Sequence, residues 1–296
     1  KFLHYFRYCK KCFKIKSTYI DGTSLGRSSV SIVNKKELQD GKVVKRLSNY
    51  KPKDKLLENE TYLSTVKFSP FSAATGRWTS GMHTVPWRSP AREFYGSRYL
   101  GGIVIAPDYS QAEIRVLAAS SQEDNLLKAY AEGIDVHMMT AKGIFGDNPS
   151  ESQRRFSKMG TFRILYGGSS KGFADQNLSG NVELANRIYE GFYETYPKVK
   201  DWVAKKHREV RDTGVVTLMT GRYIRIPRQD YEKKMLNQAQ NFPIQGASSD
   251  MTADVMFMMY KYLRDNSLKS KPFCFVHDSL ELDIHPNEIF SFIPVA

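Results

Sequence analysis

The stretch that decides the fold is GGIVIAPDYSQAEIRVLA, residues 101–118. Its apolar run at residues 103–105 predicts a buried strand that ends at a polar turn carrying Asp108. The apolar spacing that follows predicts a helix over residues 111–119. A carboxylate is therefore expected at the junction between a strand and a helix.

A second segment, FCFVHDSLELDI at residues 273–284, predicts two strands around a tight turn that holds Asp278. Asp108 and Asp278 are 170 positions apart (278 minus 108). Only a fold that returns the chain to its first sheet can bring these two carboxylates together.

Between these segments the pattern is mainly helical, followed by a hairpin at VVTLMTGRYIRIP, residues 215–227. Before them, residues 1–21 are expected to be helical. Residues 22–62 are expected to form a polar insertion or loop whose one plausible strand is SVSIV. Because the sheet-forming pieces flank a helical block, the predicted class is α+β, with a helical domain inserted into a sheet layer. The further helices are expected at residues 123–132, 137–143, 151–166, 182–196, 198–213 and 241–262.

The composition favours a packed globular protein with a polyanionic partner. The 296 residues include 44 Lys and Arg against 31 Asp and Glu, a net charge of +13, with 41% hydrophobic and 12% aromatic residues. Three cysteines indicate no disulfide framework. No apolar run reaches the roughly 18 residues that a membrane span needs, so no membrane partner is expected.

Two short carboxylates at strand ends suit hard divalent cations. Mg²⁺ prefers one or two protein carboxylates together with substrate phosphate oxygens. A pair of such ions about 3.5–4 Å apart can activate a hydroxyl and stabilise a leaving pyrophosphate. Either residue alone is more commonly a helix cap, in the case of Asp108, or a turn residue, in the case of Asp278.

A third segment, RRFSKMGTFRILYGG at residues 154–168, carries a basic and aromatic stripe. Arg154, Lys158, Phe162 and Tyr166 recur every four residues and so share one helix face. Cations there suit a triphosphate, and aromatic rings suit a sugar and a base. An amphipathic helix with a basic face and two core aromatic residues fits the pattern equally well.

Taken in order, these segments resemble the family A DNA polymerases, the bacterial polymerase I group and its phage relatives. DYSQAEIRVLA resembles their first palm motif, RRFSKMGTFRILYGG their fingers-helix motif, and VHDSLEL their last palm motif. The similarity runs from about Lys14 to the C-terminus and includes four further segments: KIKSTY at residue 14, ATGRW at 74, GIDVHMMTA at 133 and NFPIQGASSD at 241.

The resemblance implies a right-hand polymerase fold, in which an antiparallel palm sheet carries an inserted helical fingers domain. Residues 1–21 would end the thumb and residues 22–62 would be the insertion. Residues 63–121 and 223–296 would form the palm, and residues 122–222 the fingers.

For the active site, the resemblance implies two Mg²⁺ ions held by Asp108, Asp278 and the carbonyl of Tyr109. The incoming dNTP would meet Arg154 and Lys158 at its triphosphate, helped by His137 and Gln111. Phe162 would stack on the sugar, Tyr166 would lie near the template base, and Glu113 would exclude a ribose 2′-hydroxyl. The residues expected to contact primer–template DNA are Arg77, Asn241, Gln245 and His277.

Three positions depart from the family pattern. Ser279 stands where a Glu is usual after the last-motif Asp, so altered efficiency is expected rather than loss of activity. Arg163 stands where Gly is usual, which adds bulk and charge near the template base. Asn237 stands where an Arg is usual, so one minor-groove contact is expected to be lost.

The function expected from this resemblance is template-directed DNA synthesis on a primer, without a proofreading exonuclease in this chain. A second chain that supplies thumb, C-terminal palm or exonuclease is an expected partner. The alternatives are a primer–template-binding subunit that is inactive without such a partner and a single-subunit RNA polymerase-like enzyme, against which Glu113 counts. A phage or bacterial origin, with a cytoplasmic location, is expected, and an organellar origin stays open.

Overall fold

The computed structural model describes residues 30–34, 38–39, 42–43, 62–66, 73–79, 96–227, 232–276 and 279–292. The chain forms two compact units, residues 1–109 with 252–296 and residues 110–251. The predicted thumb helix at residues 1–21, and the site residues His277 and Asp278, lie outside the described residues.

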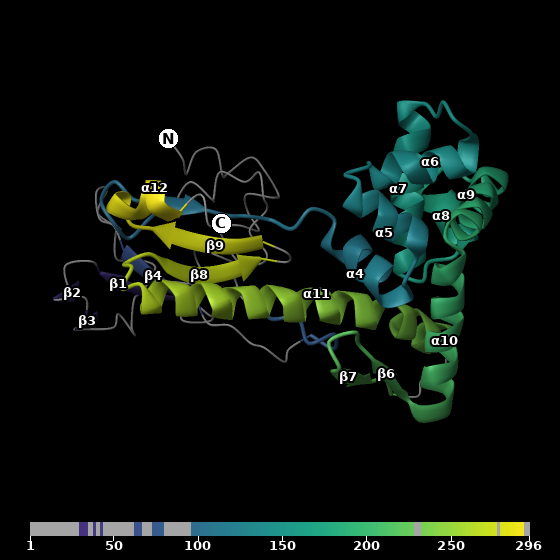
Figure 1. Cartoon of the computed structure of the whole chain (residues 1–296). Coiled ribbons are helices and arrows are strands. Elements are labelled where there is room, and N and C mark those ends of the chain that lie inside the picture. Colours follow the sequence, from purple (N-terminus) through teal and green to yellow (C-terminus); the bar gives the residue numbers. More distant parts are fainter. Residues whose placement is uncertain are drawn as a thin grey trace, which may run out of the picture. The chain divides into compact units, whose positions relative to one another are not determined.

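In the first unit, the strands predicted around Asp108 and Asp278 do share a sheet. β5 (Ile103–Ile105), β9 (Ser279–Ile284) and β8 (Lys271–Val276) are antiparallel in the order β5-β9-β8. Figure 1 shows β8 and β9 side by side. Leu280, Leu282 and Ile284 form the buried core of this sheet, and apolar residues of the helical segment after Thr252 pack against it. The chain therefore returns to its first strand, as the sequence required.

The expected burial of β5 is wrong. Ile103 and Val104 are 36% and 37% exposed, and Ile105 is half-buried. Within the described part of the chain β5 pairs with β9 alone, so it is an edge strand with a hydrogen-bonded neighbour on one side only. A continuous apolar run predicted a strand correctly but not its position at the edge of the sheet.

The polar segment contains more strand than expected. β1 (Val30–Asn34) confirms the predicted SVSIV strand, but it pairs with β4 (Tyr62–Val66), and β2 (Leu38–Gln39) pairs with β3 (Lys42–Val43). β2 and β3 were not predicted, because a strand of two residues is too short to show an alternating apolar pattern. After β9 come the 3₁₀-helix η5 (Pro286–Glu288) and α12 (Ile289–Phe292).

The second unit is the predicted helical block, with a continuous core to which α4, α5, α6, α7, α9, α10 and α11 all contribute buried apolar residues. α6, α7, α8 and α9 share a second core around Phe173 and Ile188. The helices are α4 (Ala112–Ser121), α5 (Asp124–Ala131), α6 (Val136–Phe145), α7 (Glu151–Leu165), α8 (Ser170–Asn177), α9 (Val182–Thr195) and α10 (Pro197–Thr213) (Figure 1).

Two elements of this block differ from the expectation. α8 was not predicted, because its sequence SKGFADQN buries only Phe173 and Ala174 and so has little apolar periodicity. α11 (Glu232–Asp265) begins nine residues before the predicted start at Asn241 and continues through Pro243. Proline is commonest in the first turn of a helix, which favoured the later start. The predicted hairpin is present as β6 (Val215–Thr217) and β7 (Tyr223–Arg225).

Candidate active site

The carboxylate of Asp108 lies at the end of the β5–β9 pairing. Asp108 forms an antiparallel bridge with Ser279, and the amide of Leu280 donates to the carbonyl of Pro107 over 3.0 Å. Ser279 directly follows Asp278 in the sequence. The sheet register thus joins the two carboxylate-bearing segments that are 170 positions apart.

Asp108 is exposed, and its side chain has no hydrogen bond or ion pair with another described residue. Such a free carboxylate is a suitable hard oxygen ligand for Mg²⁺. No group of three His, Cys, Asp or Glu residues placed to hold a metal occurs among the described residues, which exclude Asp278. Tyr109 is half-buried, and burial raises the pKa of its phenol.

In the second unit, two of the predicted nucleotide-binding residues, Gln111 and Glu113, lie at the start of α4. Gln111 precedes α4 in a left-handed conformation, φ 57°, and its Oε1 accepts a hydrogen bond from the Tyr130 hydroxyl over 2.9 Å. Glu113 is 7% exposed. Its carboxylate accepts hydrogen bonds from the Tyr166 hydroxyl, 2.8 Å to Oε2 and 3.0 Å to Oε1. The structure therefore brings Glu113 and Tyr166 together.

The basic and aromatic stripe forms as predicted on α7. A capping box of Ser150 and Gln153 starts the helix, and Tyr166 is its C-cap. Lys158 is exposed and has no ion pair with another described residue, whereas Arg154 is paired with Asp135. Phe162 is half-buried against the core of the unit.

His137 lies beside this stripe on α6. It is 3% exposed, and its ring centroid is 6.1 Å from that of Phe162. Its Nδ1 is buried with no hydrogen-bond partner in the described part of the chain. Burial, together with the nearby charge of Lys158, lowers the pKa of His137. The imidazole is therefore neutral at pH 7 and offers a donor or acceptor rather than a fixed positive charge.

The predicted DNA-binding residues lie in both units. Asn241 and Gln245 are one turn apart on α11, Asn241 buried and Gln245 half-buried. Arg77 is half-buried within residues 73–79 of the first unit.

The three departures have distinct surroundings. Ser279 is buried in its bridge with Asp108. Arg163 is half-buried, and its Nε is buried without a hydrogen-bond partner among the described residues. Asn237 lies against Gly167, where a Cβ would be 2.8 Å from the Asn237 Cα.

Residues that sequence reasoning missed include Asp135 and Tyr130. Asp135 caps α6 and pairs with Arg154, and Tyr130 bonds to Gln111 while the Arg115 guanidinium lies 4.1 Å from its ring centroid. Asp135 had a local signal, since Asp directly before a helix is a favoured N-cap. The pairing of Asp135 with Arg154 on another helix had no signal in the local sequence.

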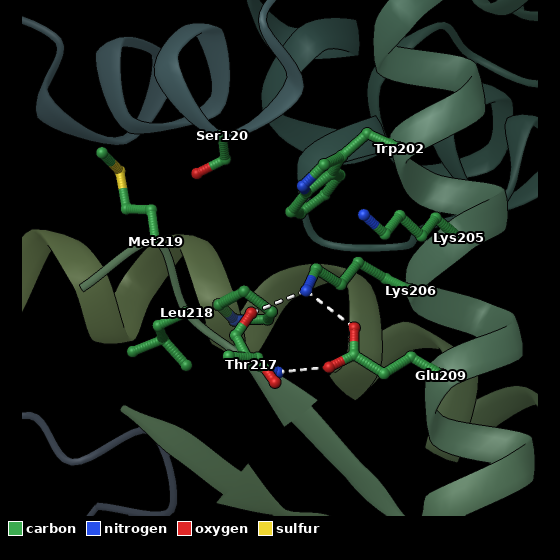
Figure 2. A pocket seen from close by; sticks show the side chains of 9 residues that line it. Ser120, Trp202, Lys205, Lys206, Glu209, Thr217, Leu218 and Met219 are labelled. Carbon is green, nitrogen blue, oxygen red and sulfur yellow. Dashed lines mark hydrogen bonds and ion pairs between the residues drawn. The ribbon is translucent and has the colours of Figure 1, made fainter. Parts of the chain in front are cut away.

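A separate cavity of about 350 Å³ lies between α4, α10, the β6–β7 hairpin and α11 (Figure 2). In it the Lys206 ammonium donates to Glu209 Oε2 over 2.7 Å and to the Thr217 carbonyl over 2.6 Å, while the Thr217 amide donates to Glu209 Oε1 over 2.7 Å. This network compensates the charge of Lys206. None of the predicted site residues lines the cavity, which is bounded by Ser120, Trp202, Lys205, Lys206, Glu209, Thr217, Leu218, Met219 and Pro243.

The family model described as DNA polymerase family A matches residues 10–295. The chain belongs to DNA polymerase family A. It is 31% identical over 264 residues to the thermostable DNA polymerase I of Thermus aquaticus. The aligned region covers 84% of this chain and 31% of that protein. It is 34% identical over 198 residues to DNA polymerase I of Lactococcus lactis subsp. cremoris, 63% of this chain and 22% of that protein.

Among solved structures, this family A chain is similar to the POL domain of Pol1 from M. smegmatis, which was determined in complex with DNA primer-template and dNTP. The TM-score is 0.71 at 26% identity, over 78% of this chain and 43% of that one. The chain thus spans less than a third of the length of these curated relatives. Among the described residues, no helix has the length and apolar character needed to cross a bilayer.

Proposed function

We propose that this chain is the palm and fingers part of a DNA-directed DNA polymerase that extends a primer with dNTPs. The observation that carries the proposal is the bridge between Asp108 and Ser279, because it joins the two segments whose carboxylates would bind metal. Membership of family A supports the reaction class. The M. smegmatis polymerase domain binds primer-template and dNTP, and the same ligands are proposed here.

Asp108, Asp278 and the Tyr109 carbonyl are the proposed ligands of two Mg²⁺ ions. When bound, these ions would polarise the primer 3′-hydroxyl and the α-phosphate and stabilise the charge on pyrophosphate. The carboxylate of Asp108, which is exposed and has no partner among the described residues, fits this role. The protein's own contribution is to position the reactants and to place fixed charge around them.

The fingers residues are proposed to bind the nucleotide. Arg154 and Lys158 would contact the triphosphate, with His137 and Gln111 beside them, and the ring of Phe162 would lie against the sugar. Glu113 is buried and fixed by Tyr166, so its carboxylate makes a rigid barrier to a 2′-hydroxyl. Arg77, Asn241, Gln245 and His277 are proposed contacts to primer–template DNA.

Primer extension tests the proposal. The chain is incubated with a primed template, Mg²⁺, and either dNTPs or NTPs, and DNA binding is measured in parallel. Extension with dNTPs and much weaker extension with NTPs is expected. Binding of primer–template without any extension would instead support a subunit that needs a second chain. Equal extension with NTPs would support an RNA polymerase-like enzyme.

A further inference from the structure

A single carboxylate, that of Asp135, holds the guanidinium of Arg154. Nη2 of Arg154 donates to Asp135 Oδ2 over 2.6 Å, and Nε donates to the same oxygen over 3.1 Å. Asp135 is the N-cap of α6, and Arg154 lies on α7, 19 positions further along the chain. The Asp135 hydrogen bond raises the pKa of Arg154 further, so its positive charge is permanent.

The other carboxylate oxygen of Asp135 caps α6. Oδ1 accepts hydrogen bonds from the amides of His137, over 2.9 Å, and Met138, over 3.2 Å. Partial burial alone would raise the pKa of Asp135. The bonds from Arg154 and from the two amides outweigh it, and the net pKa lies below the ordinary value. One ionised side chain therefore connects the start of α6 to Arg154 on α7.

Within the described part of the chain, the geometry leaves some hydrogens of the Arg154 guanidinium without a partner. A guanidinium has five N–H donors in a fixed fork. Asp135 takes Nε and one hydrogen of Nη2, both on the same edge. Glu151 takes one hydrogen of Nη1 over a longer 3.3 Å, and its side chain is 79% exposed. The remaining hydrogens of Nη1 and Nη2 are available to an anion.

From this geometry we propose that Asp135 is a positioning residue for nucleotide binding. It fixes one edge of the Arg154 guanidinium so that the opposite edge faces the triphosphate, and it fixes the helix start that carries His137. A pre-oriented guanidinium loses less freedom when a phosphate binds, which strengthens the ground-state complex. This proposal rests on the proposed function, because it assigns Arg154 to the triphosphate of a dNTP.

The test compares Asp135→Asn with Glu151→Gln. Both changes remove one negative charge next to Arg154, and Asn still caps a helix well. Because Asp135 orients Arg154, which is proposed to bind the triphosphate, Asp135→Asn should raise KM for dNTP by about 10-fold with kcat little changed. Glu151→Gln should leave KM unchanged or lower it slightly, since it only removes a repulsive charge. Glu151→Gln should keep the wild-type Tm, and Asp135→Asn should lower it only slightly, because Asn still caps α6 but loses the ionic bond to Arg154. Both variants should keep the wild-type affinity for primer–template.

A double-mutant cycle shows whether the effect passes through Arg154. In an Arg154→Ala background, Asp135→Asn should change KM by less than about twofold, because its partner is already gone. The proposal is overturned if Asp135→Asn lowers KM, which would make Asp135 a competitor of the triphosphate. It is also overturned if the two single carboxylate variants behave alike, or if the full effect persists without Arg154.

A binding measurement separates this proposal from the polymerase activity. Inorganic tripolyphosphate should raise the Tm of the wild-type chain and of Glu151→Gln. It should raise the Tm of Asp135→Asn and of Arg154→Ala much less. If this pattern holds while the chain fails to extend primers, the proposed function fails and the role of Asp135 stands. If tripolyphosphate does not stabilise the wild-type chain, the role of Asp135 is refuted.

Discussion

The hydroxyl of Tyr166 donates to both carboxylate oxygens of Glu113, over 2.8 and 3.0 Å, although the two residues are 53 positions apart. The bond joins the C-cap of α7 to the first turn of α4. It restricts the buried carboxylate to one orientation. Sugar selection, if Glu113 carries it, should therefore depend on Tyr166 as well.

Removing either partner tests this dependence. Glu113→Ala should raise the use of NTPs relative to dNTPs by about 10- to 100-fold, because the barrier to a 2′-hydroxyl is lost. Tyr166→Phe keeps the ring and removes only the hydroxyl, and it should give a smaller change in the same direction. The measurement is kcat/KM for matched dNTP and NTP pairs. An unchanged ratio in Glu113→Ala would refute its assignment to the sugar.

Lys158 should act on the nucleotide and not on the duplex. Loss of one charge-assisted hydrogen bond, about 1.5–3 kcal/mol, predicts that Lys158→Ala lowers kcat/KM for dNTP by about 10- to 100-fold. Affinity for primer–template should change less than threefold. Lys142→Ala, at the exposed end of α6, is the control and should have little effect on either quantity. Equal losses in nucleotide use and duplex binding would contradict the triphosphate role.

The close approach of α7 to α11 requires a glycine at position 167. Gly167 has φ 68°, and a Cβ there would lie 2.8 Å from the Cα of Asn237. Gly167→Ala should destabilise the chain by the strain of a left-handed Ala, about 1–2 kcal/mol, plus the cost of the clash. Gly180→Ala is a matched control, because φ is 83° but no atom lies within 4 Å of its Cβ. Equal shifts in Tm for the two variants would show that the contact with Asn237 costs nothing.

The pattern of helices could be predicted from the sequence better than their contacts. The four-residue spacing of Arg154, Lys158, Phe162 and Tyr166 indicated one face of a helix, and α7 ends within one residue of the predicted end. The pairing of Arg154 with Asp135 links α7 to the start of α6, and no local sequence pattern predicts which helix surfaces pack together. Periodicity describes one element at a time, whereas contacts between elements depend on how all of them pack.

The sheet shows the same division. The two apolar segments around Asp108 and Asp278 predicted strands. That these strands belong to one sheet was inferred from the metal site that both carboxylates would share, and β5 and β9 do pair. The exposure of Ile103 and Val104 could not be predicted, because central and edge strands can have the same apolar sequence pattern. The Nδ1 of His137 is buried with no hydrogen-bond partner in the described ranges, and the sequence carried no signal for this either.

Two histidines should make the chain less stable in mild acid. Burial and nearby cations lower the pKa of both His137 and His207 from 6.5. Below about pH 6.5 the unfolded chain takes up protons that the folded chain resists, so stability is complete above that pH and is lost as the pH falls towards the lowered values. Urea unfolding between pH 8 and pH 5 measures this loss. His207→Gln should reduce the pH dependence, and an unchanged dependence would exclude His207 as a contributor.

The most direct measurement is primer extension and DNA binding by Asp108→Asn and Asp278→Asn alongside the wild-type chain. Each substitution keeps the side-chain volume and removes a charged metal ligand. If both carboxylates bind the catalytic metals, each variant should lose synthesis by at least about 1,000-fold while its affinity for primer–template stays within about threefold of wild type. Synthesis that survives either substitution at a near-normal rate would contradict a shared metal site at the junction of β5 and β9.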